Sequence, residues 1–370
     1  MGKDKERNYA CDVIRIVATY IVVATHVKLA FWDADSINNT RLLIACLFGD
    51  GVSIFFILSG FFMFDGSAFS SKIRKCILSI ALPALLVAIM TQFIYPWICS
   101  GSILGGITFD ISWKDVGASI IQQNAGNLPG CFHFWYIFSY IKWILFYPLL
   151  KWICQEGREQ SFCRWLLIIL QVVAVLANNV KLIYNIPLNV YSLVDTSILL
   201  GTIGFEIRCN KNVIKGNFRI RIASLIIFMG TNFFRFVAQK KLYSIDINNG
   251  CYINWDSIFG IVGATAIFCF IYSWGFDNIN TRVKNMIMFI SNRTFTIYLF
   301  HVIIYFKCSS IGLQDKFIKF CSGKNIYFGD LVYSLIYPLF IFIITLIISI
   351  LLYVCINAIK CKVRQSKAKA

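Results

Sequence analysis

Hydrophobic residues in this chain gather into ten long runs, separated by short polar stretches. The runs cover residues 10–31, 42–64, 77–98, 133–153, 164–183, 190–208, 220–238, 255–275, 286–306 and 329–357. Each run approaches the ~20 residues that a helix needs to cross a bilayer. We therefore predict an all-α polytopic integral membrane bundle of about ten transmembrane helices. It forms a single domain over residues 1–370, with the spans at about 10–357 and a basic tail at 358–370.

The amino-acid composition also indicates a protein that is surrounded mainly by lipid. Hydrophobic residues make up 58% of the 370 residues, charged residues only 14%, and the mean hydropathy is +0.70. A soluble domain needs more charge to cover its surface. The net charge of +17 could suggest nucleic acid, but the basic residues lie in short runs between apolar segments, as in loops that flank membrane helices. We therefore predict membrane lipid, and no nucleic acid, as a partner.

The basic residues also predict the orientation of the chain. The N-terminal tail, residues 65–76, 151–164, 208–221 and 276–285, and the C-terminal tail hold 21 of the 35 Lys and Arg residues, and the opposite loops hold 10. By the positive-inside rule, both termini are then cytoplasmic. The Lys-rich segment 307–328 lies on the predicted outer side, against the rule, but one segment does not reverse the overall excess of Lys and Arg on the inner side. We predict a multi-pass protein of the plasma membrane.

Arg15 and His26 are the most informative polar pair, because both lie inside the first apolar run. Eleven residues at ~100° per residue return to nearly the same helix face, and at ~1.5 Å per residue they separate the two side chains by about 16 Å. Ionisable groups at such depth are costly and typically mark a pathway or a reacting centre. In the alternative, structural interpretation, His26 only forms hydrogen bonds between helices, and the side chain of Arg15 extends to the inner lipid headgroups.

The other polar residues extend this pattern. The three histidines of the chain, His26, His133 and His301, all fall toward the outer halves of their predicted spans, as does Asp50, whereas Arg293 falls nearer the inside with Arg15. A neutral buried imidazole can act as a general base toward a hydroxyl, and a carboxylate can orient it. Inner arginines suit an anionic, phosphate-bearing ligand from the cytoplasm.

The fourteen cysteines show no CxxC pair and no metal-ligand spacing with histidine, so we predict no metal site. Most of them lie in apolar segments, where Cys behaves as a small hydrophobic residue. A Cys99–Cys131 or a Cys308–Cys321 disulfide stays open, because these residues fall near predicted outer loops.

Four segments resemble motifs of one family, and they occur in that family's order. They are Asp12-Val-Ile-Arg15 through His26, Asp50-Gly-Val-Ser-Ile-Phe-Phe-Ile-Leu-Ser59-Gly60-Phe61, His133-Phe-Trp135-Tyr136, and Ser291-Asn292-Arg293 through Ile297-Tyr298-Leu299-Phe300-His301. Together they resemble the membrane acyltransferase-3 family, which includes O-acetyltransferases of bacterial surface polysaccharides. The resemblance runs over most of the chain. In the second motif, the small Ser59-Gly60 pair would permit close helix approach.

The resemblance implies an acyl-CoA donor, usually acetyl-CoA, used from the cytoplasm as a substrate with no permanently bound cofactor. It implies an acceptor hydroxyl on an envelope glycan or related molecule at the outer face of a bacterial membrane. We expect His26 to be catalytic, as general base or as a transiently acylated group, with Arg15 and its neighbour Asp12. The Asp12–Arg15 pair is equally compatible with a purely structural role.

The remaining site residues follow from the same resemblance. We expect Arg15, Lys72, Arg74, Lys75 and Arg293 to bind the donor, and His133, Trp135, Tyr136, His301, Asp50 and Ser59 to bind the acceptor. An aromatic belt at the interface explains Trp135 and Tyr136 equally well. The family's Arg-x-x-Arg pair has only Lys72-Ile-Arg74-Lys75 as its nearest equivalent, and Val302 stands where many relatives have Pro.

A second function class competes with the enzyme. A transporter or flippase for a small polar solute or a glycan precursor would use the polar stripe as a substrate route. It predicts interrupted helices at equivalent positions of two halves, and the sequence shows no such internal symmetry. The acceptor, the acyl chain length and homo-oligomer formation stay open.

Overall fold

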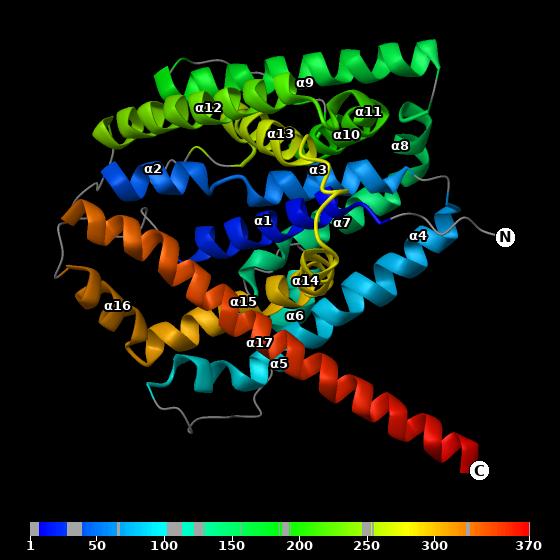
Figure 1. Ribbon diagram of the computed structural model, residues 1–370, viewed down its shortest axis with the longest axis vertical. Coiled ribbons are helices and arrows are strands. Elements are labelled where there is room, and N and C mark those ends of the chain that lie inside the picture. The colour runs from blue at the N-terminus through cyan, green and yellow to red at the C-terminus, as the bar shows by residue number, and fades with distance from the viewer. Residues whose placement is uncertain are drawn as a thin grey trace.

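The computed structural model describes residues 7–27, 39–64, 67–101, 113–121, 128, 130–155, 157–184, 186, 192, 194–245, 253, 255–322 and 326–369 (Figure 1). All regular secondary structure in these ranges is helical. The prediction of an all-helical fold is thereby confirmed for the described part of the chain.

The first half of the chain contains α1 (Tyr9–His26), α2 (Asn39–Leu47), α3 (Gly51–Met63), α4 (Phe69–Cys76), the π-helix η1 (Ile77–Ala81), α5 (Leu82–Cys99), α6 (Trp113–Ile121), the 3₁₀-helix η3 (Phe132–Phe134), α7 (Trp135–Leu145), α8 (Tyr147–Ile153) and α9 (Arg158–Tyr184). The second half contains α10 (Thr196–Cys209), α11 (Lys211–Ile214), α12 (Phe218–Ile245), α13 (Ile258–Tyr272), α14 (Thr281–Ser291), α15 (Thr294–Ser310), α16 (Leu313–Ser322) and α17 (Ile326–Lys369).

Six helical segments in the described ranges are long and apolar enough to cross a membrane. They are Tyr9–His26, Asn39–Met63, Phe69–Cys99, Arg158–Tyr184, Phe218–Leu242 and Phe328–Ala358. A seventh span is formed if α14 and α15, which meet at a 56° bend, count as one. All six, and the bent pair, coincide with predicted spans. The total of ten stays a prediction.

The other three predicted spans hold shorter helices. The run at 133–153 is divided at Phe146 into α7 and α8, and Pro148 stands at the start of α8. Proline suits a first helical turn because its missing N–H has no partner there anyway. α10 has only 14 residues and α13 only 15, fewer than the ~20 that cross a bilayer unaided.

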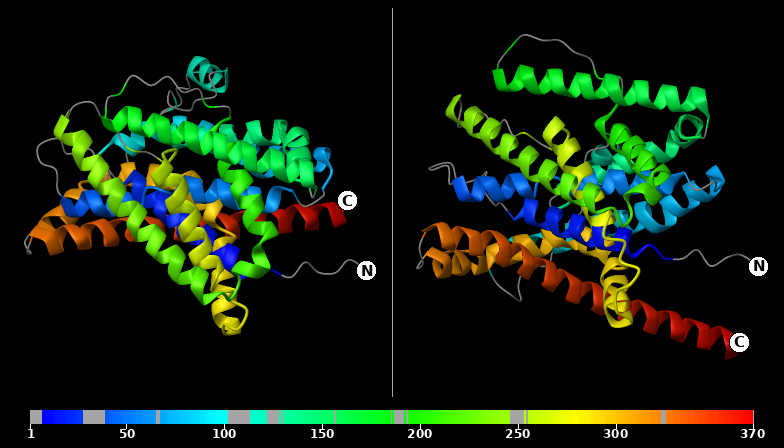
Figure 2. Two further views of the ribbon diagram at one scale, coloured as in Figure 1. Left: turned by 90° about the horizontal axis from the view of Figure 1, so that it is seen from above. Right: turned by 45° about the horizontal axis from the view of Figure 1, so that its top comes forward.

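The helices form layers around α1, which packs against α3, α13, α14, α15 and α17. In Figures 1 and 2, α9 and α12 lie on one side of α1 and α3, and α15, α16 and α17 lie on the other. The α1 span is 56% buried within the protein, whereas the α12 span is 17% buried. α1 is therefore an interior helix, and α12 presents most of its apolar surface to lipid.

Helices α3 and α10 approach closely at glycines. A Cβ atom added to Gly60 would lie 2.0 Å from the carbonyl oxygen of Gly201, and one added to Gly204 would lie 2.0 Å from the carbonyl oxygen of Ile57. Only a residue without a side chain fits at either position. The predicted role of Gly60 in close helix packing is confirmed.

Two further features complete the fold. α1 starts and α17 ends on the same side of the molecule, at the right of Figure 1.

The thiols of Cys99, Cys131 and Cys308 are free. Neither disulfide left open by the sequence, Cys99–Cys131 or Cys308–Cys321, is therefore formed.

Candidate functional site

The three histidines converge from three separate elements. His26 ends α1, His133 lies in η3 and His301 lies in the first half of α15. Their ring centroids are 5.0 Å apart for His26 and His301, 4.9 Å for His133 and His301, and 5.8 Å for His26 and His133. Imidazoles more than 100 residues apart along the chain thus form one group, here called the histidine cluster.

Hydrogen bonds assign the ring protons of His26 and His301. Nδ1 of His301 lies 2.8 Å from the carbonyl oxygen of Tyr298, so it carries a proton and donates. In the neutral ring, Nε2 of His301 then accepts, and its neighbour at 3.2 Å is Nδ1 of His26. Nδ1 of His26, which also lies 2.8 Å from the carbonyl oxygen of Val22, is therefore the protonated nitrogen. This leaves Nε2 of His26 as the nitrogen that carries the lone pair, as a general base requires.

His133 is held behind the other two rings. Its side chain is 1% exposed, and Nε2 donates to the carbonyl oxygen of Tyr298 at 3.1 Å. The hydroxyl of Tyr298 donates in turn to the carbonyl oxygen of His133 at 2.5 Å. His133 thus locks η3 to α15 and is buried, rather than lining an open mouth as predicted.

The cluster is not arranged to hold a metal. Two of its ring nitrogens donate to the carbonyl oxygen of Tyr298 and so present protons rather than lone pairs. Within the described ranges, no group of three or more His, Cys, Asp or Glu residues has the geometry of a metal site.

His26 opens on a cavity of about 170 Å³. Its lining residues in the described part of the chain are Val22, Thr25 and His26 of α1, Gly49, Gly51 and Val52 around the start of α3, Trp135, and Trp255. The rings of Trp135 and Trp255 stack with centroids 5.2 Å apart. Trp135 therefore forms a wall of the cavity beside the predicted base. Sequence reasoning missed Trp255, which precedes α13 and reaches the same wall.

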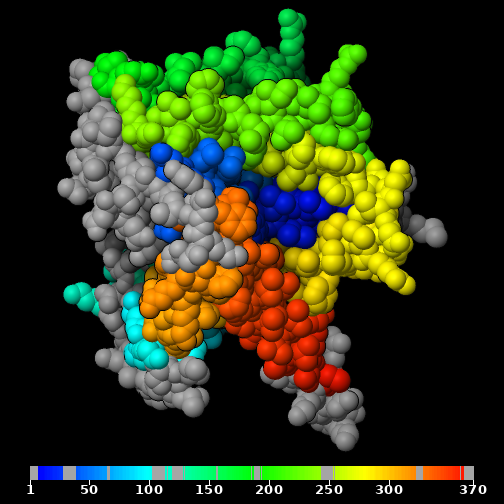
Figure 3. Space-filling model, turned by 60° about the vertical axis from the view of Figure 1, so that its left-hand side comes forward, coloured from blue at the N-terminus to red at the C-terminus, as the bar shows by residue number. Residues whose placement is uncertain are grey.

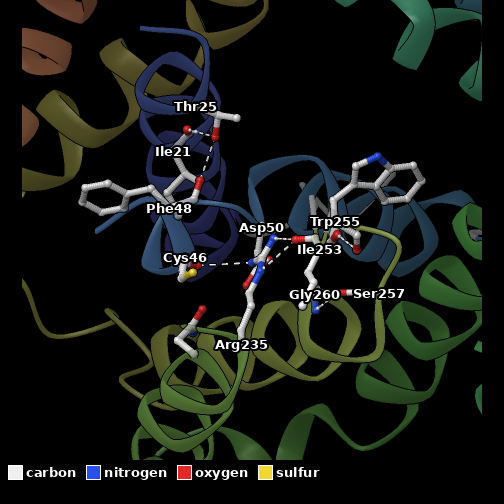
Figure 4. A network of polar contacts seen from close by, with 12 residues as sticks. Ile21, Thr25, Cys46, Phe48, Asp50, Arg235, Ile253, Trp255, Ser257 and Gly260 are labelled. Carbon is white, nitrogen blue, oxygen red and sulfur yellow. Dashed lines mark hydrogen bonds and ion pairs between the residues drawn. The ribbon is translucent and has the colours of Figure 1, made fainter. Parts of the chain in front are cut away.

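Directly behind the cavity lies a buried ion pair, drawn in Figure 4. Nη1 of Arg235 lies 2.7 Å from Oδ1 of Asp50, with the two side chains 0% and 1% exposed. The same guanidinium donates to the carbonyl oxygens of Cys46 and Ile253. The structure thus pairs Asp50, a predicted acceptor-binding residue, with Arg235 rather than with a histidine.

A second polar group surrounds Arg15, about three turns from His26 on the same continuous helix. Nη1 of Arg15 lies 2.8 Å from Oδ1 of Asp12 and 2.9 Å from the hydroxyl of Ser291. Ser291 donates to the same carboxylate at 2.7 Å. Nε of Arg7 lies 2.6 Å from Oδ2 of Asp12, and its Nη2 lies 2.9 Å from Oδ1 of Asn292. These residues are called the arginine cluster.

The arginine cluster can meet an anion, because two positive side chains share one carboxylate. The side chains of Arg7 and Arg15 are 35% and 31% exposed, whereas that of Asp12 is 5% exposed. Figure 3 shows dark-blue atoms of α1 at the surface between yellow α13 and α14 and red-orange α17. Arg7, Ser291 and Asn292 were missed as site residues, although two of them stand in the fourth motif.

Arg293 is not part of the arginine cluster. It lies at the bend before α15, where Nη1 donates to the carbonyl oxygen of Phe289 at 2.6 Å. Its guanidinium covers the rings of Phe289 and Tyr353, at 3.6 and 5.0 Å from their centroids. These contacts give Arg293 a structural role at the bend, in place of the predicted donor contact.

The predicted basic group at Lys72, Arg74 and Lys75 lies on α4. Arg74 and Lys75 are exposed, and Nζ of Lys72 lies 5.8 Å from the ring centroid of Tyr147. α4 lies on the same side of the molecule as the start of α1 (Figure 1). These cations therefore share the end of the molecule where the arginine cluster lies.

Ser59 and Tyr136 are packed in the interior. The hydroxyl of Ser59 donates to the carbonyl oxygen of Phe55 at 2.8 Å and lies 3.4 Å from the hydroxyl of Tyr136. The ring of Tyr136 packs on Phe56, with centroids 4.7 Å apart. Neither residue is among those that line the cavity beside His26.

The geometry thus places an imidazole at an apolar cavity at one depth of α1 and a cationic group at another depth of the same helix. No match was found among curated proteins, nor among solved structures. A family model described as an acyltransferase domain matches residues 8–354, a range that includes the histidine cluster, the cavity and, apart from Arg7, the arginine cluster. The chain therefore belongs to the acyltransferase-3 family, and it is a membrane protein with an acyltransferase domain.

Proposed function

We propose that this protein transfers an acyl group, with acetyl the expected one, from cytoplasmic acyl-CoA to a hydroxyl of a bacterial envelope glycan or related acceptor. The observation that carries the proposal is the arrangement of His26. Its Nδ1 is fixed by Val22 and His301, which leaves the lone pair on Nε2, and its side chain lines the cavity.

The chemistry is a single acyl transfer. Nε2 of His26 takes the proton of the acceptor hydroxyl while that oxygen bonds to the thioester carbonyl carbon. The carbon–sulfur bond then breaks, the CoA thiolate leaves, and the imidazolium returns the proton to the sulfur. The products are an ester and CoA-SH. In a variant of this step, Nε2 itself attacks the thioester and is acylated transiently.

The donor's charges would meet the arginine cluster. CoA carries phosphates, and guanidinium groups bind phosphate oxygens through paired N–H groups. Arg15, with Arg7 and the cations of α4, supports a site for these phosphates. The ~16 Å from Arg15 to His26 along α1 would then be spanned by the extended pantetheine arm, placing the thioester beside His26.

The test compares envelope glycans by mass spectrometry in cells that express the wild type, the His26→Ala variant or no protein. We expect one acetyl mass to be added by the wild type only. Melting temperatures in detergent check that His26→Ala remains folded. Equal glycan masses in all three, or full transfer by His26→Ala, would refute the proposal. Altered solute uptake with unchanged glycans would instead favour the transporter, which no observation on the described residues supports.

A further inference from the structure

The cavity beside His26 is larger than an acetyl group needs. Its volume is about 170 Å³, and an apolar protein cavity of ~150 Å³ holds a benzene molecule with six carbons. An acetyl group has one methyl group beyond its carbonyl carbon. The space therefore accommodates an acyl chain of about four to six carbons.

The lining favours a hydrocarbon chain over a sugar. Val22, Val52 and the two stacked tryptophans present apolar surfaces. The hydroxyl of Thr25 lies 2.7 Å from the carbonyl oxygen of Phe48 and 2.9 Å from that of Ile21, as Figure 4 shows. Its proton is therefore already donated. A sugar would bring several hydroxyls, and each one buried without a partner costs ~1–3 kcal/mol.

Two glycines in the lining leave no room for larger side chains on that wall. A Cβ on Gly51 would lie 2.9 Å from the carbonyl oxygen of Ala18, and one on Gly49 would lie 2.5 Å from the guanidinium of Arg235. Arg235 also binds the carbonyl oxygen of Ile253, two residues before Trp255. The backbone at this wall therefore packs directly against α1 and against the buried Arg235–Asp50 ion pair.

We infer that this cavity is the acyl pocket, and that it accepts acyl groups of four carbons as well as acetyl. The inference rests on the proposed function and adds the size of its substrate. In the transfer, the thioester carbonyl carbon would lie at Nε2 of His26, and the alkyl chain would lie between Val52 and the tryptophan pair.

The experiment compares acetyl-CoA with butanoyl-CoA as donors, using purified protein in lipid vesicles and envelope glycan as the acceptor. Released CoA thiol gives kcat/KM for each donor. Val52→Phe narrows the cavity and Trp135→Leu widens it. Val173→Phe is the matched control, because Val173 is 55% exposed on the lipid-facing helix α9.

We expect the wild type to use both donors. Val52→Phe should lower the butanoyl-to-acetyl ratio of kcat/KM by at least ~10-fold, since one methylene group in a pocket is worth about 10-fold or more. Trp135→Leu should raise the ratio, and Val173→Phe should leave it unchanged. A wild type that uses acetyl-CoA alone, or ratios that neither cavity variant changes, would overturn the inference and leave the proposed function standing. No thiol release with either donor would overturn both.

Discussion

Nε2 of His301 lies 3.2 Å from Nδ1 of His26, and this contact makes His301 a positioning residue for the proposed base. When His26 takes a proton, its ring becomes cationic, and its Nδ1–H then donates more strongly to His301. Hydrogen bonds to charged groups contribute ~1.5–3 kcal/mol. The pair therefore stabilises the protonated form of His26 that arises during transfer.

His301→Phe should reduce kcat about 10- to 100-fold, because the imidazolium loses this acceptor. The KM for the acyl donor should change little, since His301 lies away from the arginine cluster. The pH profile of kcat, measured in vesicles, should shift to lower pH, because an imidazolium without its acceptor loses its proton more readily and the neutral base then forms at lower pH. An unchanged kcat and profile would show that His301 only fills space.

Asp12→Asn should raise the KM for the acyl donor by about 10-fold or more. The neutral amide no longer holds Arg7 and Arg15 together, so the guanidinium of Arg15 loses its fixed direction. Equal effects on kcat and on kcat/KM would argue against a donor-binding role. Arg293→Gln is the comparison, and it should leave this KM unchanged because Arg293 lies outside the cluster.

Arg235→Met should destabilise the fold by ~3–5 kcal/mol, as expected when one partner of a buried ion pair is removed. Asp50 is 1% exposed and would be left as a buried charge without its counter-ion. The double variant Asp50→Asn/Arg235→Met should lose less than the single variant. Denaturant unfolding in detergent measures both, and a greater loss in the double variant would contradict the pairing.

Gly60→Ala should destabilise the protein by ~1–3 kcal/mol or more, because the added methyl group meets the backbone of Gly201. Gly230→Ala in α12 is the matched control, since no atom lies within 4 Å of its added Cβ. That control should be neutral, or stabilising by up to ~1 kcal/mol through helix propensity. Thermal unfolding of the two variants provides the comparison, and similar losses would refute the close contact.

The helical character of the chain and much of the site could be predicted from local pattern. Long apolar runs identify membrane helices without knowledge of their neighbours. The 11-residue spacing of Arg15 and His26 places them at two depths of one helix, as α1 shows. The sequence predicts His301 as an acceptor-binding residue, and its direct contact with His26 does not follow from local pattern.

The contacts between distant segments could not be predicted in this way. Asp50 and Arg235 are 185 residues apart, and helical periodicity does not determine which helices become neighbours. A signal was present nonetheless, because Arg235 is one of only four Lys and Arg residues that lie outside the predicted loops and tails. A buried guanidinium requires a counter-ion. Trp255 and Arg7 lie outside helices and carried no periodic signal.

The 56° bend between α14 and α15 lets this stretch of chain contact α1 at two separate residues. Ser291, just before the bend, touches Arg15, and His301, on the far side, touches His26. The two ends of the proposed path from Arg15 to His26 thus contact the same pair of helices. Any change in the angle of this bend would displace the contact of Ser291 with Arg15 and the contact of His301 with His26 together.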